Sequence, residues 1–215
     1  MIAGRTLAAA VLAGGRGRRI GGGKPARLLG GRPLLEHVLD RLRPQVSRLL
    51  VSGPAGDEAL ERPGLPVIAD AVPGGRGPLA GLLGAMDWLA VQAPECQWLL
   101  SVPVDVPFLP GDLLARLAAA LADGGAEIAC AGSAGTVHPV IALTPLLLRP
   151  ELARMVLVED GRKVKDWLGR HRVRVVSWPA GDLDPFFNVN LPGDLAAAEI
   201  RFAQEGSRVD SAGVA

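Results

Sequence analysis

A run of six apolar residues, Leu7–Leu12, leads directly into the glycine-rich segment Ala13–Pro25. The run has no polar alternation, which is typical of a strand buried on both faces of a parallel sheet. Six of the eleven residues from 14 to 24 are glycines, which allow the backbone to take positive φ and to approach a ligand closely. A buried strand that ends in such a loop predicts a ligand-binding edge of an α/β sheet.

Strands and helices alternate through the first half of the chain. Apolar runs predict three further strands, at residues 48–51, 65–69 and 97–101. Apolar side chains at helical spacing predict helices around them, at residues 33–43, 78–89 and 110–121. Because this rhythm is that of βαβ units, we expect an α/β fold, a three-layer sandwich with a mostly parallel, Rossmann-like sheet.

The second half of the chain is less regular. Residues 127–131 and 140–143 flank a turn of small residues and are predicted to pair as strands, and a further strand is expected at 173–177. Helices are predicted at residues 145–158, 163–169 and 192–204. No internal repeat or linker divides the chain. We therefore expect one domain over residues 1–205, followed by a disordered tail of small and polar residues at 206–215.

Composition argues against several classes of protein. The 215 residues carry 23 basic and 22 acidic side chains, whereas a general nucleic-acid binder needs a basic excess. The apolar runs are too short or too interrupted to span a bilayer, and we expect no signal peptide. Cys96 and Cys130 are too few for a disulfide framework or a thiolate zinc site, and we expect buried free thiols. These features predict a cytoplasmic protein with neither a nucleic-acid nor a membrane partner.

Polar residues follow the predicted strands at the edge where the carboxyl ends of the strands meet. The glycine-rich segment follows the first strand, Ser52 follows the second, Asp70 the third and Asp105 the fourth. Ligands of open parallel sheets bind at this edge. The pattern therefore predicts one binding site there, built from segments that are far apart in the sequence.

The glycine-rich segment also concentrates positive charge. It contains Arg16, Arg18, Arg19 and Lys24, whose mutual repulsion is relieved when a polyphosphate binds. The segment is neither a G-x-G-x-x-G fingerprint nor a Walker loop, because Lys24 is followed by Pro25. The alternative interpretation is a solvated basic loop that binds nothing.

Asp105 lies in the stretch Pro103-Val-Asp-Val-Pro at the end of a predicted buried strand. The prolines stiffen the backbone that carries the carboxylate, which suits a ligand of Mg²⁺. One protein carboxylate is adequate because phosphate and water oxygens complete the coordination of this ion. The alternative is a turn or helix-capping residue, a role that Asp112 fits better by position.

Two further polar features remain. Asn188 and Asn190 alternate on an extended segment, so both amides point the same way and could bind a metal, a phosphate or a ribose. The alternative for them is a turn before a helix. His138 is interpreted as structural, because no metal spacing and no local Ser/His/Asp or Cys/His signature surrounds it.

Several segments resemble the motifs of a known family. The N-terminal signature of nucleotidyltransferases with a GT-A-like fold is similar to Leu12-Ala-Gly-Gly15, Arg18-Arg-Ile-Gly-Gly-Gly-Lys24-Pro and Gly31-Arg-Pro-Leu-Leu-Glu-His-Val38. Within that fold, Gly77-Pro-Leu-Ala-Gly81 and Phe187-Asn-Val-Asn190 resemble the MobA-like branch, the molybdenum cofactor guanylyltransferases. The similarity runs in order from about residue 10 to residue 199. It implies a nucleotidyltransferase fold of the GT-A type.

The resemblance implies a reaction in which GTP and the molybdenum cofactor (molybdopterin) give the guanine dinucleotide cofactor and pyrophosphate, with Mg²⁺ bound. Lys24 and Arg19 would neutralise the phosphates, Asp105 would ligate Mg²⁺, and Asn188 and Asn190 would lie near the metal or the pterin phosphate. Further nucleotide contacts are implied for Leu12, Ala13, Gly14, Gly15, Ser52, Asp70, Gly77 and Gly81. The implied partners are GTP, molybdopterin, and a molybdoenzyme or a cofactor-delivery protein.

The sequence departs from the family pattern at a few positions. Gly23 stands where the family usually has Asp, Ser52 where relatives often have Asn, and Val104 where many have Cys. Lys24 and the metal carboxylate Asp105 are both retained. The departures therefore leave the residues that bear the implied chemistry in place.

Three alternative functions stay open. The cytidylyl version of the same reaction is the nearest, although Ala13-Gly14-Gly15 resembles the guanylyl branch. Transfer of a nucleotide to a sugar phosphate or an alcohol phosphate is the second. A non-catalytic nucleotide-binding or carrier protein is the third, but it would need neither a metal carboxylate nor a cation for the leaving group.

Overall fold

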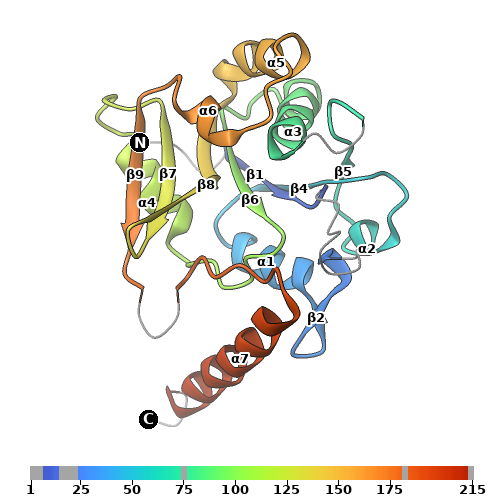
Figure 1. Ribbon diagram of the computed structural model, residues 1–215, viewed down its shortest axis with the longest axis vertical. Helices are drawn as coiled ribbons and strands as arrows, with labels where there is room; N and C mark the ends of the chain where they lie inside the picture. The colour runs from blue at the N-terminus through green and yellow to red at the C-terminus, as the bar shows by residue number, and fades with distance from the viewer. Residues whose placement is uncertain (1–6, 15–23, 74–76, 181–183, 213–215) are drawn as a thin grey trace.

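A seven-stranded sheet runs through the middle of the molecule (Figure 1). The computed structural model describes residues 7–14, 24–73, 77–180 and 184–212, and the strands of its sheet follow the order β5-β4-β1-β6-β8-β7-β9. Their bounds are β1 (Leu7–Leu12), β4 (Arg48–Ser52), β5 (Val67–Ile68), β6 (Trp98–Pro103), β7 (Ile128–Ser133), β8 (Thr136–Pro145) and β9 (Val173–Trp178).

The direction of the strands confirms the mostly parallel sheet. β1 pairs in parallel with β4 on one side and with β6 on the other, and β4 pairs in parallel with β5. β7 and β9 are also parallel. β8 pairs antiparallel with both β6 and β7, so the hairpin expected from residues 127–143 is present and joins the parallel half of the sheet. The carboxyl ends of β1, β4 and β6 consequently lie at one edge.

Helices cover both faces of the sheet. The α-helices are α1 (Leu34–Leu42), α2 (Glu58–Glu61), α3 (Pro78–Gln92), α4 (Leu113–Ala120), α5 (Arg149–Leu157), α6 (Val164–Leu168) and α7 (Pro192–Ala212). Along β1, Ala9 and Val11 pack in a core with α1 and α4, whereas Ala8 and Ala10 pack in a core with α3 and α5. This alternation explains why the strand sequence is apolar throughout, and it confirms the three layers.

Some elements differ from the sequence prediction. The sequence missed α2 and a two-stranded hairpin of β2 (Leu28–Leu29) and β3 (Arg32–Pro33), because such short elements show no hydrophobic period. The helix expected at 145–158 begins as a 3-10 turn, η4 (Leu146–Leu148), before α5, whose first turn accepts Pro150. Helix α7 includes residues 206–212, for which the sequence predicted a disordered tail.

Helix α7 packs on the β2–β3 hairpin and fixes the chain segment that precedes it. Leu29, Phe108, Val189 and other apolar side chains form a third core cluster there. The backbone N–H of Val189 donates to the carbonyl oxygen of Asp105 at 2.8 Å. The segment before α7 is thereby attached to the end of β6, where the candidate site lies.

Both cysteines are buried free thiols, as predicted. Burial raises the pKa of the Cys130 thiol to about 12, so this thiol is protonated and unreactive at neutral pH. Among the helices in the described part of the chain, none has the length and apolar character that crossing a membrane requires.

Candidate functional site

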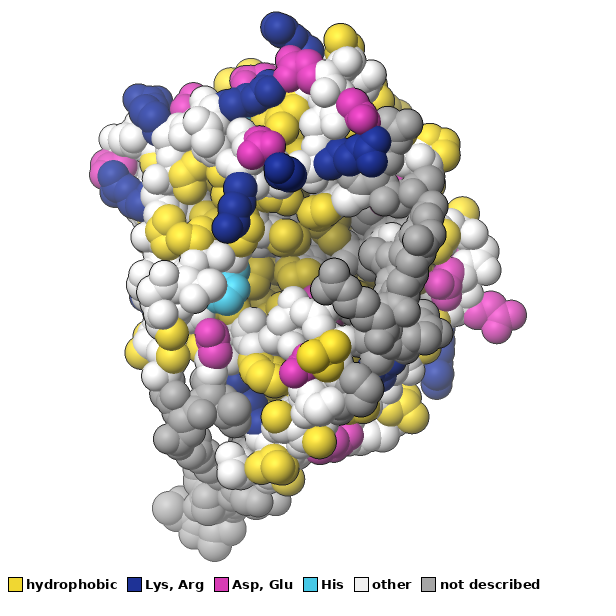
Figure 2. Space-filling view, in the orientation of Figure 1, with side chains coloured by type: hydrophobic (Ala, Val, Ile, Leu, Met, Phe, Trp, Pro, Cys, Tyr) yellow, Lys and Arg dark blue, Asp and Glu magenta, His cyan; other side chains and the backbone are white. Residues whose placement is uncertain are grey.

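A cavity of about 370 Å³ opens at the carboxyl ends of β1, β4 and β6. Its walls come from these strand ends, the segment after β5, the start of α3, the middle of β8 and the segment before α7. Figure 2 shows a hollow in the middle of one face of the molecule, with hydrophobic side chains in its floor. The volume is within the range of small-molecule sites.

Most of the predicted site residues line this cavity. They are Leu12, Ala13, Gly14, Ser52, Asp70, Gly77, Gly81, Asp105 and Asn188. For eight of them the convergence follows from the parallel topology, because they end or follow a strand or lie in the first turn of α3 at the same edge, whereas Asn188 comes from the segment before α7.

Four predicted residues are not placed in the cavity. Gly15 and Arg19 lie outside the described residues, and of Lys24 only the backbone is described, at the start of the 3-10 turn η3 (Lys24–Ala26). Asn190 does not line the cavity: its backbone N–H donates to Asp194 in the first turn of α7, at 2.9 Å. Between the two asparagines, Val189 is fully buried in the core.

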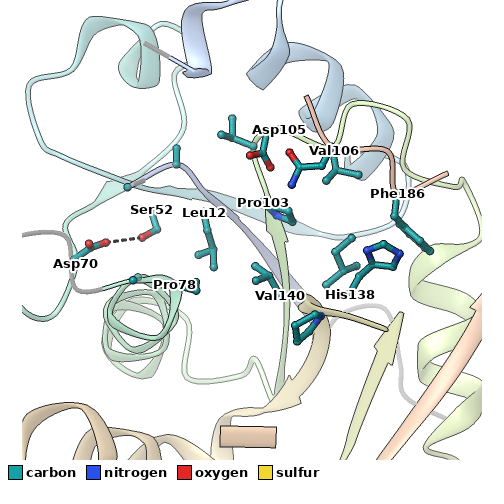
Figure 3. A pocket seen from close by; sticks show the side chains of 18 residues that line it. Leu12, Ser52, Asp70, Pro78, Pro103, Asp105, Val106, His138, Val140 and Phe186 are labelled. Atoms are coloured by element: carbon teal, nitrogen blue, oxygen red, sulfur yellow. Dashed lines mark hydrogen bonds between the residues drawn. The ribbon is translucent and has the colours of Figure 1, made fainter. Parts of the chain in front are cut away.

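One end of the cavity holds a carboxylate in a partly buried position. The hydroxyl of Ser52 donates to Oδ1 of Asp70 at 3.4 Å (Figure 3). Burial raises the pKa of Asp70, and the hydrogen bond from Ser52 opposes that change. The fold therefore keeps a carboxyl group where its charged form is disfavoured, which indicates a role in accepting donors from a ligand.

Helix α3 begins beside Asp70 and turns its N-terminus toward the cavity. Its N-cap residue, Gly77, has φ 92°, a conformation that side chains other than hydrogen disfavour, and Pro78 follows in the first turn. Both residues line the cavity. The free N–H groups at the start of this 15-residue helix favour an electronegative ligand group nearby.

Gly81 on α3 lies so close to the hydrogen-bonded Ser52–Asp70 pair that a larger residue at this position would displace one of these side chains. A Cβ at Gly81 would lie 2.6 Å from Oγ of Ser52 and 3.2 Å from Oδ1 of Asp70. We expect Gly81→Ala to lower Tm by a few degrees, because the added methyl group has to displace the hydroxyl of Ser52. Gly193→Ala is the matched control, because Gly193 is also helical and has open space around it. Thermal unfolding measures the Tm of both variants, and an unchanged Tm in Gly81→Ala would contradict the close packing.

Asp105 lies at the middle of the cavity rim, on a well-fixed backbone. It is 7% exposed, and the backbone N–H of the preceding residue, Val104, donates to the carbonyl of Leu12 at 3.2 Å. Figure 3 shows Asp105 between the Ser52–Asp70 pair on one side and His138 and Phe186 on the other. Its carboxylate is thus placed to meet a ligand that extends along the cavity.

The donor atoms near Asp105 fit a hard divalent cation. Asp105 offers carboxylate oxygens and Asn188 an amide oxygen, the ligand types that Mg²⁺ prefers. Within the described residues, no group of three or more His, Cys, Asp or Glu side chains lies close enough to hold a metal. A cation held here would take its remaining ligands from substrate phosphates and water, as Mg²⁺ often does.

The expected capping role of Asp112 is only partly correct. Asp112 occupies the N-cap position of α4, but its side chain makes no capping hydrogen bond. Its Oδ1 instead accepts from the indole Nε1 of Trp178 at 2.8 Å. Because the carboxylate of Asp112 accepts from the indole N–H of the buried Trp178 side chain, it does not cap the N-terminus of α4.

The opposite end of the cavity contains polar residues that the sequence analysis did not assign to the site. His138 and Phe186 line it, with ring centroids 4.9 Å apart. Oγ of Ser133 lies 2.7 Å from Nε2 of His138 and donates to the carboxylate of Asp184 at 2.7 Å. Burial lowers the pKa of His138, opposed by the charge of Asp184, so its imidazole is neutral at neutral pH. Ser133 and Asp184 are 51 residues apart, so no local motif could have indicated the cluster.

The raised pKa of Asp70 makes a testable prediction about stability. The folded protein binds a proton at Asp70 more tightly than the unfolded chain, so the free energy of unfolding falls as pH rises from about 3.8 through the raised pKa. Asp70→Asn, which cannot ionise, is therefore expected to have a higher Tm than the parent at pH 7 and a similar Tm below pH about 4. Thermal unfolding without ligand at both pH values tests this, and a lower Tm of the variant at pH 7 would contradict it.

The chain is similar to known proteins over most of its length. Residues 9–175 match the family model of the MobA-like NTP transferase domain. The molybdenum cofactor guanylyltransferase of Rhodopseudomonas palustris (strain BisB5) is 49% identical over 201 residues, which are 93% of this chain and 95% of that protein. The protein of the same name from Bradyrhizobium sp. (strain ORS 278) is 46% identical over 91% of this chain and 92% of its own length.

The fold is also similar to a solved structure. Molybdopterin-guanine dinucleotide biosynthesis protein A from Archaeoglobus fulgidus superposes with a TM-score of 0.71 at 27% sequence identity. The superposition covers 92% of this chain and 99% of the other. The layered fold is therefore shared with that protein.

Proposed function

The chain belongs to the family of MobA-like NTP transferase domains, and on that premise we propose how its cavity works. The protein is a nucleotidyltransferase that transfers GMP from GTP to the molybdenum cofactor, forming the guanine dinucleotide cofactor and releasing pyrophosphate. The observation that carries the residue assignment is the convergence of nine predicted contact residues on one cavity at the strand ends.

In this proposal the nucleotide occupies the half of the cavity bounded by β1, β4 and α3. Asp70 accepts N–H or O–H donors of the nucleoside part, and Ser52 orients its carboxylate. The backbone of Leu12 to Gly14 lies alongside, and Gly81 leaves the space that the Ser52–Asp70 pair occupies. The phosphates extend toward Asp105, with Lys24 and Arg19 supplied by the glycine-rich segment.

Mg²⁺ is the metal that we propose, held by Asp105 with the amide oxygen of Asn188 nearby. When bound, it neutralises phosphate charge that would otherwise repel the incoming nucleophile. Asp105 contributes a fixed position, because the hydrogen bond from Val189 to its carbonyl and the Val104–Leu12 bond hold its backbone. Burial of Asp105 strengthens the electrostatic interaction of its carboxylate with a bound cation.

The acceptor brings its own nucleophile. A phosphate monoester is already ionised at neutral pH, so its oxygen attacks the α-phosphorus of GTP without a strong base in the protein. The bond between the α-phosphorus and the oxygen that bridges it to the β-phosphate breaks, and pyrophosphate leaves with the electron pair of that bond. The protein then contributes alignment of the two substrates and neutralisation of charge on the phosphates, for which Lys24, Arg19 and Asp105 are the candidates.

One assay separates this function from its alternatives. The protein is incubated with Mg²⁺ and each of the four NTPs, in separate reactions with molybdopterin, a sugar phosphate or an alcohol phosphate as the acceptor, and released pyrophosphate is measured. We expect release with GTP and molybdopterin together. Release from CTP alone among the nucleotides would support the cytidylyl version. Release only with a sugar or alcohol phosphate as the acceptor would support the second alternative. No release with any acceptor would support the non-catalytic binder.

We also propose a cytoplasmic location, which supplies GTP and suits two free thiols. The product is expected to pass to a molybdoenzyme or to a cofactor-delivery protein. Copurification of the guanine dinucleotide with such a partner would test that transfer.

A further inference from the structure

A chain of three polar side chains ends in the wall of the cavity, at the end away from Asp70. Asp184 accepts from the hydroxyl of Ser133, whose Oγ also lies 2.7 Å from Nε2 of His138. Ser133 is 1% exposed and does not line the cavity, whereas His138 does. Figure 3 shows His138 beside Phe186 and Val140 in this wall. The arrangement differs from a nucleophilic triad, because the serine sits between the other two residues and away from the ligand space.

The positions of the protons follow from the partners. Both oxygens of the Asp184 carboxylate face Oγ of Ser133, and Oδ1 also accepts from the backbone N–H of Phe186 at 2.8 Å. A serine hydroxyl has one proton, and the carboxylate can only accept, so that proton lies toward Asp184. Oγ of Ser133 then accepts from His138, which requires the neutral tautomer with its proton on Nε2.

This tautomer leaves Nδ1 of His138 with a lone pair. Among the described residues, the hydrogen bond of the His138 ring is the one between Nε2 and Ser133. The wall therefore offers one hydrogen-bond acceptor next to the aromatic ring of Phe186. A flat heterocycle with N–H donors matches this combination, whereas a phosphate group would meet a lone pair and no proton.

We propose that Nδ1 of His138 accepts a hydrogen bond from an N–H donor of the pterin ring of the acceptor substrate, and that Ser133 and Asp184 are positioning residues that fix its tautomer. This inference rests on the proposed function, since it assigns the acceptor to the end of the cavity that the nucleotide leaves open. The pterin would lie against Phe186, with its phosphate directed toward Asp105.

Two isosteric substitutions at His138 distinguish the ring nitrogens. The amide oxygen of an asparagine lies near the position of Nδ1, so His138→Asn keeps an acceptor for the pterin. The amide of a glutamine lies near the position of Nε2, so His138→Gln keeps the contact with Ser133 and loses the acceptor. We expect His138→Gln to raise KM for molybdopterin about tenfold with KM for GTP unchanged, and His138→Asn to stay within about threefold of the parent for both substrates.

Ser133→Ala tests the positioning role. It removes the group that fixes the tautomer, and we expect KM for molybdopterin to rise about threefold or more with no change in KM for GTP. The ¹⁵N chemical shifts of the His138 imidazole should report one tautomer in the parent and a mixture in Ser133→Ala. His138→Gln combined with Ser133→Ala should be no worse than His138→Gln alone.

The outcomes separate the inference from the proposed function. If the parent protein releases pyrophosphate from GTP and molybdopterin but His138→Gln leaves both KM values unchanged, the pterin contact is wrong and the transferase stands. A rise in KM for GTP alone would place the nucleotide at His138 and overturn the assignment. Equal effects of His138→Asn and His138→Gln would also overturn it. Thermal unfolding of each variant, with the Tm compared with that of the parent, separates these kinetic effects from loss of the fold.

Discussion

Replacing Asp105 by alanine is expected to lower kcat about 100-fold or more, the largest effect of any cavity residue that the structure describes in full. Asp105 is the carboxylate at the middle of the cavity, and the proposal assigns to it the metal that neutralises the triphosphate. Asp105→Asn has nearly the same shape without the charge, so we expect a similar loss. Steady-state kinetics with GTP, molybdopterin and Mg²⁺ measures both variants.

The control for Asp105 is Asp112→Asn. Asp112 lies on the same connection between β6 and α4, but its carboxylate contacts Trp178 and does not line the cavity. Asp112→Asn is expected to retain the kcat of the parent. Because Asp105 is buried, the thermal stability of each variant has to be measured as well. Near-normal kcat in a folded Asp105→Ala would remove this residue from the metal site.

Replacing Lys24 by alanine is expected to have an effect of the same size, about 100-fold or more on kcat. The proposal assigns this lysine of the glycine-rich segment to the phosphates, where its ammonium would stabilise the charge that develops on the leaving pyrophosphate. KM for GTP should change much less than kcat if the interaction strengthens in the transition state. Lys165→Ala, which removes an exposed lysine of α6, is the control and should leave kcat unchanged.

The double variant shows whether the two charged residues act on the same group. If Lys24 and Asp105 both stabilise one triphosphate, combining the alanine substitutions should reduce kcat by less than the product of the single effects. Full multiplication of the two effects would indicate independent roles. Single-turnover measurements at saturating GTP avoid a contribution from product release.

The parallel half of the fold and its ligand-binding edge were predictable because they depend on local patterns. An uninterrupted apolar run such as Leu7–Leu12 is typical of a strand covered on both faces, and the two cores that share its alternate residues confirm this prediction. Once the strands are parallel, the residues that follow them meet at one edge whatever their identity. Ser52, Asp70 and Asp105 could therefore be brought together from the sequence alone.

The remainder of the site depends on contacts that no local pattern encodes. The link from Asp184 to Ser133 joins segments 51 residues apart, and it arises because β7 pairs with β8 while the chain after β9 returns to the cavity. The same holds for Asp112, which does not cap α4 because its carboxylate accepts from the indole of Trp178, 66 residues away. His138 looked structural in the sequence because its partners become visible only in the fold.

A crystal structure with GTP and Mg²⁺ tests the central assignment most directly. We predict density for one triphosphate that the Lys24 ammonium contacts. A metal ion should bind both this triphosphate and Asp105, about 2.1 Å from a carboxylate oxygen of Asp105. The nucleotide base should lie on the Asp70 side of the cavity. Density that places the Lys24 ammonium and the Asp105 carboxylate in separate clefts, too far apart to reach one triphosphate, would contradict it.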